Sequence, residues 1–510
     1  MLSKIKSYGL VGLEGYLVDV EIDINNGLPG FDTVGLPDAA VKESKERVKS
    51  AIKNSGYEYP IYKIIVNLAP ANTKKEGPIY DLAIAVGLLS ATEQIAVHNP
   101  DDYVILGELS LNGEIRKVDG LLPMLISARE QGYKKFIIPF DNAKEASFID
   151  GIEIYACKKL TDVVEFLKGE LKLDKLQTSS YETIIENAKV INDFSFVKGQ
   201  KQAKRAMEIA AAGGHNVIMM GPPGSGKTML AKSFPSILPD MTFEEALEVT
   251  KIHSVAGKLD HNQGIIVNRP FRAPHHTTTV ITLTGGGNKA KPGEISLAHN
   301  GVLFLDELPE YPRQVVETLR QPLEDGSITV ARLNQSVEYP ASFTLIASMN
   351  PCPCGYYGSK THECKCSASQ IHSYLSKLSG PLMDRIDLHV EVDSVEYNDL
   401  SKDTVEESSA VIKERVNKAR KIQIERFKGT TIHNNAEMTP ALVKKYCKID
   451  TACDNLLRHA FEKFNLTARA HDRILKVART IADLDGSEEI TAEHILEAIN
   501  YRSLDRKFWI

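Results

Sequence analysis

The feature that most constrains this chain is an eight-residue run, Gly221-Pro222-Pro223-Gly224-Ser225-Gly226-Lys227-Thr228. The run fits the pattern G-x-x-x-x-G-K-[ST], follows the apolar stretch Val217–Met220 and precedes the helical stretch Met229–Phe234, which is the strand–loop–helix context of a phosphate loop. Its glycines allow backbone N–H groups to surround phosphates at a helix N-terminus. Lys227 offers a cation to the β and γ phosphate oxygens, and the Thr228 hydroxyl offers a ligand to Mg²⁺. We therefore expect ATP and Mg²⁺ to bind here.

A second motif supplies two carboxylates. The apolar run Gly301–Leu305 ends at Asp306 and Glu307, as expected of a buried parallel strand whose carboxyl end faces the ligand. The run looks like a Walker B element, in which Asp306 holds Mg²⁺ through water and Glu307 orients and deprotonates the attacking water. The alternative interpretation is a pair of solvated acids at a strand end.

The length of 510 residues predicts about three domains. Residues 1–170 alternate β-like and helical runs, and residues 171–192 form a polar linker. Residues 193–395 alternate helices with apolar strands, which predicts a parallel sheet with helices on both faces. Residues 396–510 carry helical signals. The predicted class is α/β, with an α+β N-terminal domain, a P-loop parallel-sheet core and a C-terminal helical lid.

Composition narrows the possible partners and compartments. A formal net charge of −6 argues against a uniformly basic nucleic-acid coat, although local cationic loops can still bind phosphates. The N-terminal segment is broken by Glu14, Asp19 and Glu21, so we expect no signal peptide, no membrane partner and a cytoplasmic location. Seven cysteines are too few and too odd in number for a disulfide framework.

Four of these cysteines gather in one short stretch, as Cys352-x-Cys354 and Cys364-x-Cys366 with nine residues between the pairs. This spacing can close a tetrahedral Cys₄ site for a structural Zn²⁺. Pairs with one intervening residue are less typical than C-x-x-C, and His362 is an alternative ligand. Reduced, metal-free cysteines are the other interpretation. Four thiolates leave no open position, so zinc catalysis is not expected.

Four longer stretches make a resemblance specific. Asn268–Thr277, Gly285–Glu307, Met349–Gly358 and Ser379–Val392 resemble the ComM/YifB family of magnesium-chelatase-like AAA+ proteins, and the likeness covers nearly the whole chain. The resemblance implies a homohexameric ring that hydrolyses ATP at sites between subunits.

The resemblance also implies roles for three further residues. Arg385 would be the arginine finger offered to a neighbour's γ-phosphate, with a surface salt bridge to Asp384 or Asp387 as the alternative. Asn350 would help to position the lytic water, unless it is a simple turn residue. Arg469 would be a second sensor arginine at the start of a lid helix, with Arg473 competing for that role.

The family is associated with DNA branch migration during natural transformation, which implies DNA as a partner. Residues 229–305 contain several candidate contacts for a DNA backbone in loops rich in glycine and threonine. The candidates are Arg269, Arg272, His275, His276, Lys289 and Lys291. An ordinary solvated basic loop is the alternative. Two rival functions stay open, a magnesium-chelatase-type motor subunit and a protein-remodelling ATPase.

The N-terminal residues 66–87 and 104–138 resemble the proteolytic domain of Lon proteases, with informative departures. Where that family has its serine nucleophile this chain reads Ile79-Tyr80, and where the lysine base should follow it reads Leu121-Leu122. Without a nucleophile and an adjacent base there is no serine–lysine activation. We expect a scaffold or partner-binding domain and not a protease.

Overall fold

The protein is described here by a computed structural model. It describes residues 2–96, 100–185, 192–260, 264–287, 290–332, 335–359, 362–394, 406–464 and 466–502. The chain forms two compact units. Unit 1 contains residues 1–187 and 243–267, and unit 2 contains residues 188–242 and 268–510.

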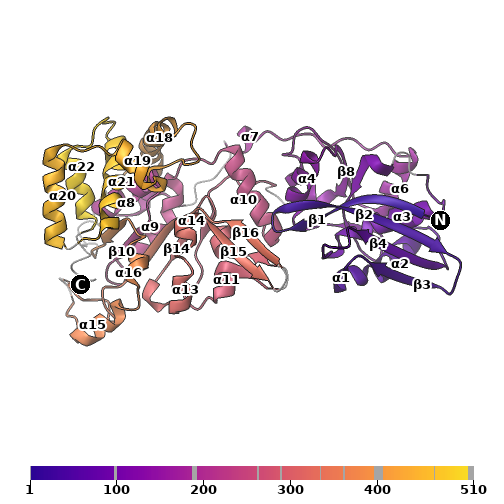
Figure 1. The fold of residues 1–510 in the computed structure, drawn as a ribbon, viewed down its shortest axis with the longest axis horizontal. Coiled ribbons are helices and arrows are strands. Elements are labelled where there is room, and N and C mark those ends of the chain that lie inside the picture. Colours follow the sequence, from indigo (N-terminus) through magenta and orange to yellow (C-terminus); the bar gives the residue numbers. More distant parts are fainter. Residues whose placement is uncertain are drawn as a thin grey trace. The chain divides into compact units, whose positions relative to one another are not determined.

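Unit 1 is built on a mixed seven-stranded sheet with the order β3-β4-β2-β1-β5-β8-β9 (Figure 1). The strands of this sheet are β1 (Leu2–Val11), β2 (Glu14–Asn25), β3 (Gly30–Val34), β4 (Lys63–Ala69), β5 (Tyr103–Ile105), β8 (Lys135–Pro139) and β9 (Glu153–Cys157). β1, β2 and β4 pair antiparallel, whereas β5, β8 and β9 continue from β1 in parallel. A small separate hairpin joins β6 (Glu108–Leu109) to β7 (Ile115–Arg116).

Unit 1 also contains helices, of which those at residues 81–91 and 121–130 contact strands β1 and β2. The helices of unit 1 are α1 (Ala39–Lys42), α2 (Ser44–Asn54), α3 (Asp81–Ala91), α4 (Leu121–Glu130), α5 (Ala143–Ala146), α6 (Leu160–Lys168), α7 (Glu182–Ile185) and α10 (Phe243–Ala256). Nearly every residue of α3 is buried, which explains why its sequence is apolar around the whole helix.

Helix α10 lies far along the sequence from the rest of unit 1. Its Ser254 carbonyl accepts a hydrogen bond from the Gly120 N–H at 3.1 Å, and its Ser254 hydroxyl donates to Glu145 at 2.9 Å. Lys117 donates to the Leu259 carbonyl at 3.4 Å. Burial raises the pKa of Glu145, which favours the protonated form of this carboxyl. A segment that the sequence assigns to the nucleotide domain therefore packs within the N-terminal unit.

Unit 2 is built on a five-stranded parallel sheet with the order β11-β14-β17-β10-β18 (Figure 1). Its strands are β10 (Val217–Met220), β11 (Phe271–Arg272), β14 (Val302–Leu305), β17 (Thr344–Met349) and β18 (Leu388–Glu391). Two hairpins accompany the sheet, β12–β13 (Gly285–Gly286 with Lys291–Pro292) and β15–β16 (Ser327–Arg332 with Gln335–Pro340). All four residues of β10 and of β14 are buried, so these runs are apolar without alternation.

Unit 2 has two sets of helices, one that accompanies the sheet and one that forms the C-terminal lid. Those of the sheet domain are α8 (Lys201–Gly213), α9 (Lys227–Ser233), α11 (Val280–Thr284), α12 (Glu294–Leu297), α13 (Arg313–Glu317), α14 (Pro322–Asp325), α15 (Ala368–Leu375) and α16 (Gly380–Met383). Those of the lid are α18 (Ser409–Arg426), α19 (Pro440–Tyr446), α20 (Thr451–Phe464), α21 (Ala468–Leu484) and α22 (Ala492–Asn500). One buried apolar cluster contains side chains of both sets, so the lid and the sheet share a core.

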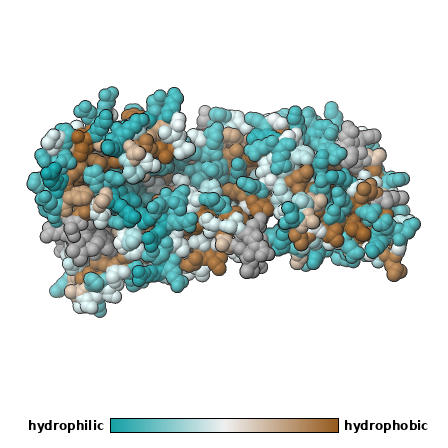
Figure 2. Space-filling view, viewed as in Figure 1, coloured by the Kyte–Doolittle hydropathy of each residue, from teal (hydrophilic) through white to brown (hydrophobic). Residues whose placement is uncertain are grey.

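The predicted α/β class, with a parallel sheet and a helical C-terminus, is confirmed. The expected boundaries at 170 and 395 stay predictions, because residues 186–191 of the linker and residues 395–405 before the lid lie outside the described part of the chain. Hydrophilic and hydrophobic residues intermingle over the face drawn in Figure 2. No helix among the described residues combines the length and the hydropathy that crossing a bilayer requires.

Candidate nucleotide-binding site

The phosphate loop joins β10 to α9, as its sequence predicts. Gly226 has a φ of +92° and directly precedes α9, a conformation that glycine adopts without strain. Lys227 is 8% exposed, and its ammonium donates to the carbonyls of Gly221 and Pro222 at 2.8 Å each. Burial lowers the pKa of Lys227, while Asp306 and Glu307 oppose that shift. The Lys227 ammonium therefore lies over the backbone of its own loop. A bound phosphate chain can replace the two carbonyls as its hydrogen-bond partner.

Thr228 and Asp306 meet at the carboxyl edge of the parallel sheet. The Thr228 hydroxyl donates to Asp306 Oδ2 at 3.0 Å. Ser348 donates to the other Asp306 oxygen and accepts from the Glu307 N–H at 3.3 Å. These hydroxyl and carboxylate oxygens are the hard donors that Mg²⁺ prefers, so the residues present fit the ion expected here.

No sequence motif marks Ser348 as a residue of this site, although a signal for it exists. In the parallel register, Leu305 of β14 lies beside Ala347 of β17. The residue after each, Asp306 and Ser348, must then be neighbours at the same edge. A strand pairing is needed to see this, and the order of strands is a tertiary property.

Glu307 leaves the sheet with an unusual backbone, a left-handed φ of +54°. Its side chain is 54% exposed, and its carboxylate lies 3.8 Å from Nδ1 of His276. The rings of His275 and His276 are 4.0 Å apart, and the Tyr311 hydroxyl fixes the same loop by donating to the Pro274 carbonyl at 2.5 Å. His276, which the sequence reasoning treated as a DNA contact, therefore lies beside the expected catalytic carboxylate.

Asn350 follows β17 and faces the phosphate loop. Its Oδ1 lies 3.4 Å from Nζ of Lys227. An amide at this place can contact both a γ-phosphate and an attacking water, which is the role expected of it.

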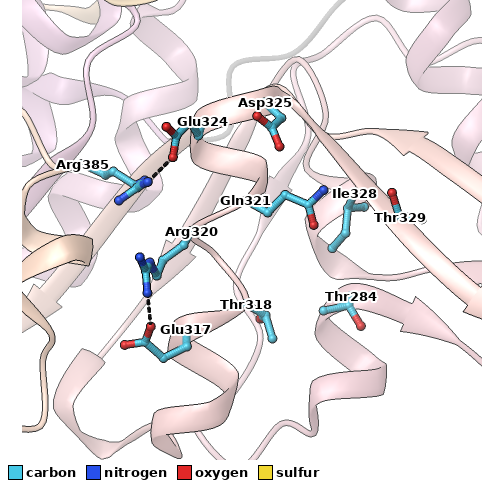
Figure 3. Close-up of a pocket in the computed structure, with 10 residues that line it drawn as sticks. All are labelled: Thr284, Glu317, Thr318, Arg320, Gln321, Glu324, Asp325, Ile328, Thr329 and Arg385. Carbon is cyan, nitrogen blue, oxygen red and sulfur yellow. Dashed lines mark hydrogen bonds and ion pairs between the residues drawn. The ribbon is translucent and has the colours of Figure 1, made fainter.

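The Arg385 guanidinium forms its hydrogen bonds outside the phosphate loop of its own chain. It donates to the Pro381 carbonyl at 2.8 Å and pairs with Glu324. Arg385 and Arg320 line a cleft of about 620 Å³. Figure 3 shows the two arginines on one side of it, each paired with a glutamate. The residues that line this cleft are Thr284, Glu317, Thr318, Arg320, Gln321, Glu324, Asp325, Ile328, Thr329 and Arg385. None belongs to the phosphate loop, and the expected alternative partners of Arg385, Asp384 and Asp387, are not the ones it takes.

The two candidate sensor arginines differ sharply. Arg469 is 67% exposed and lies 3.8 Å from Asp384. Arg473 instead pairs with the buried Asp387. Burial opposes ionisation of Asp387, but Arg473 and His215 overcome it and hold the pKa of Asp387 well below its ordinary value. Arg473 is therefore used in an ion pair with a buried carboxylate, and Arg469 is the more exposed of the two arginines.

The four clustered cysteines come together. All four sulfur atoms lie within 4.8 Å of one another, and Cys352 is buried. His362 instead stacks on Tyr356, with ring centroids 4.7 Å apart. The donor set fits a tetrahedral thiolate site and excludes His362 from the cluster found.

The proposed DNA-contacting cations are mostly engaged elsewhere. Arg269 donates to the carbonyls of Pro239 and Asn300 at 2.6 and 2.7 Å. Arg272 forms a bidentate pair with Glu294 at 2.6 and 2.8 Å. Lys291 lies in β13, and Lys289 lies outside the described residues. Arg269 and Arg272 therefore contact backbone carbonyls and a carboxylate of their own chain, and their role as DNA contacts stays a prediction.

The positions of the absent Lon dyad are filled with core residues. Ile79, Tyr80, Leu121 and Leu122 are all buried. A lysine does occur nearby, the buried Lys75, but its ammonium donates to the carbonyls of Pro70 and Thr73. The Ser254 carbonyl of α10 caps Gly120, beside the expected position of the base.

Comparisons with known proteins match the whole chain. Family models described as magnesium chelatase, subunit ChlI, as subunit ChlI of Mg-chelatase and as the ChlI C-terminal region match residues 193–400, 20–142 and 406–502. Competence protein ComM of Haemophilus influenzae is 43% identical over 509 residues, covering 99% of this chain and 98% of that protein. The uncharacterized protein YifB of Escherichia coli is 43% identical over 507 residues, with the same coverage. Lon protease 2 of Bacillus subtilis is 29% identical over 168 residues, covering 30% of each chain.

Proposed function

Because this chain belongs to the ComM/YifB family of magnesium-chelatase-like AAA+ proteins, we propose that it is an ATP-hydrolysing ring motor that acts on DNA. One observation carries the ATPase part of the proposal. Lys227, Thr228, Asp306, Glu307 and Asn350 come from three different strand ends and converge at one edge of the parallel sheet. Parallel α/β sheets bind their ligands at this edge, where the carboxyl ends of the strands meet.

Each residue has a distinct task in the proposed hydrolysis. Lys227 binds the β and γ phosphates, and Thr228 and Asp306 would hold Mg²⁺. The ion, when bound, neutralises charge that develops on the transferred phosphoryl group. Glu307 accepts the proton of the attacking water, and Asn350 orients that water against the γ-phosphate.

Completion of the site requires a second copy of the chain in this proposal. Arg385 lines a cleft that contains no residue of the phosphate loop (Figure 3). A head-to-tail ring brings one subunit's arginine to the next subunit's nucleotide, and a hexamer is the proposed closed form. Arg469 is exposed and supports a second contact across the same boundary.

DNA as the substrate rests on the family. The Haemophilus influenzae relative is a competence protein, and we propose that the present chain promotes branch migration of recombination junctions during natural transformation. We also propose that it works in the cytoplasm, where ATP and DNA are both present. The contacts of Arg269 and Arg272 shift the proposed DNA contacts toward the hairpins β12–β13 and β15–β16.

A second candidate function is a magnesium-chelatase-type motor subunit, because family models of that subunit match most of the chain. This function requires a porphyrin-binding partner subunit, which would co-purify. A third is the remodelling of protein clients, in which clients and not DNA stimulate hydrolysis.

We further propose that Cys352, Cys354, Cys364 and Cys366 hold one structural Zn²⁺. The proposed domains are 1–170, 193–395 and 396–510, with a linker at 171–192, and α10 of the second domain belongs to the same compact unit as the first. The metal content of the purified chain tests the zinc proposal directly.

The function is tested with a labelled three-way DNA junction, ATP and Mg²⁺. The wild-type protein should move the junction, and Lys227→Ala should not. If the protein hydrolyses ATP but DNA does not stimulate hydrolysis and the junction does not move, the DNA-motor proposal is rejected and the ATPase proposal is retained. Absence of any ATP turnover would reject both.

A further inference from the structure

The four-cysteine cluster is held in a metal-ready geometry. The Cys352 sulfur lies 3.3 Å from that of Cys354 and 3.7 Å from that of Cys364, and Cys354 lies 3.6 Å from Cys364. Zinc–sulfur bonds of about 2.3 Å at tetrahedral angles separate the sulfurs by about 3.8 Å. The thiols therefore need little rearrangement to bind a tetrahedral metal.

The cluster lies between Asn350 on its N-terminal side and helix α15 on its C-terminal side. Cys352 follows Asn350 by two residues, and Cys366 directly precedes Ser367, which caps helix α15 through a reciprocal pair with Gln370. A metal that joined the two cysteine pairs would thus connect the segment after β17, which carries Asn350, to the N-terminus of α15.

The segment that follows Cys354 also contacts the phosphate loop. Gly355, between Cys354 and Tyr356, has a φ of +84° and packs on Pro223. A Cβ at position 355 would lie 2.6 Å from Cδ of Pro223 and 3.9 Å from Cγ of Asn350. Only glycine fits such a contact without displacing the loop or the proline. The same Asn350 lies 3.4 Å from Lys227.

From these contacts we propose that metal in the cysteine cluster positions Asn350 and the phosphate loop, so that metal occupancy controls the rate of ATP hydrolysis. The inference rests on the proposed ATPase function. A metal that links the two cysteine pairs closes the loop of nine residues between them and removes conformational freedom that the loop has when the thiols are free. Part of the free energy of metal binding then stabilises the local fold. Cys352, Cys354, Cys364 and Cys366 are positioning residues in this proposal, because they act through Asn350 and through the contact of Gly355 with Pro223.

The inference predicts separate effects on binding and turnover. Phosphate binding is shared among several backbone N–H groups and Lys227, so a small displacement of the loop at Pro223 should weaken it little. Hydrolysis depends on the placement of the lytic water, for which an error of about 1 Å costs about 10²-fold in rate. Loss of the metal should therefore lower kcat by about 10²-fold while the Kd for ATP changes by less than about threefold.

The test compares the full-length wild-type chain with Cys364→Ser, and Cys157→Ala is the control for loss of an unrelated buried cysteine. Metal content, nucleotide binding and ATP turnover are measured for each, with circular dichroism to establish folding. Wild type and Cys157→Ala should hold about one Zn²⁺ per chain. Cys364→Ser should lose the zinc and turn over slowly at nearly unchanged affinity.

Gly355→Ala provides a test that retains all four thiols. It should keep the zinc and still lose most of its kcat, because the added methyl group pushes the cluster off Pro223. Treatment of wild type with phenanthroline in excess Mg²⁺ should also lower kcat, and added Zn²⁺ should restore it.

The outcomes separate the two levels of the proposal. If wild type turns over ATP and holds zinc, but Cys364→Ser and phenanthroline leave kcat unchanged, the positioning role is rejected and the ATPase and zinc site survive. If wild type never holds a metal, both the zinc site and this inference are rejected. If wild type has no turnover, the proposed function itself fails.

Discussion

Replacement of Arg385 by alanine separates a catalytic contact from a structural one. Within its own chain Arg385 is 11% exposed but pairs with Glu324, which is 61% exposed. An ion pair open to water on one side is worth about 0–1 kcal/mol, so Arg385→Ala should fold normally. If Arg385 reaches a neighbour's γ-phosphate, hydrolysis should fall by about 10³–10⁵-fold, or about 4–7 kcal/mol of transition-state stabilisation.

A mixing assay makes the prediction specific to a shared site. Arg385→Ala retains an intact phosphate loop, and Lys227→Ala retains an intact arginine finger, so neither alone should hydrolyse ATP. In rings assembled from an equal mixture, about a quarter of the boundaries combine an intact loop with an intact finger, and about a quarter of wild-type turnover should return. Arg458→Ala, which breaks an exposed pair with Asp454, is the matched control and should turn over normally. Wild-type turnover by Arg385→Ala, or no recovery in mixed rings that do assemble, would refute the reasoning.

The remaining predictions concern the same site and the lid. Glu307→Gln should bind ATP and lower hydrolysis by about 10²–10⁴-fold in a steady-state assay, and near-normal turnover would remove Glu307 as the base. Ser348→Ala removes a donor to Asp306 and should weaken Mg²⁺ affinity by about 10–100-fold in a titration of ATPase rate against Mg²⁺. Arg473→Ala leaves Asp387 buried without its main cation and should lower the free energy of unfolding by about 3–5 kcal/mol, whereas Arg469→Ala should slow hydrolysis without a change in stability. The folded state depresses the pKa of Asp387, so the ionised carboxylate contributes stability above pH ~4, and this contribution is lost as the pH falls below that value. The difference in unfolding free energy between wild type and Arg473→Ala should therefore shrink in strong acid.

Local sequence patterns located the elements that carry the two nucleotide motifs. The apolar run 302–305 is β14 without change, and the apolar stretch Val217–Met220 is β10. These elements are predictable because side-chain spacing and burial act over a few residues.

The membership of α10 could not be predicted in this way. Its residues read as an insertion in the nucleotide domain, yet Ser254 bonds Gly120 and Glu145 of the N-terminal unit. Helical spacing indicates that α10 buries one face, but it carries no information about which surface covers that face. No local sequence pattern therefore predicts that α10 packs within the protease-like N-terminal unit.

The sequence by itself determined the phosphate loop, the pair Asp306–Glu307 and the cysteine pairs, because each is a contiguous motif whose chemistry follows from residue type and short-range backbone geometry. Only the tertiary structure decided that Ser348 supports Asp306, that His276 faces Glu307, that Arg473 is used in an ion pair with a buried carboxylate and that Gly355 packs on Pro223. Each of these contacts joins residues from separate strands, loops or helices. They depend on strand order and packing, which emerge only when the whole chain buries its core.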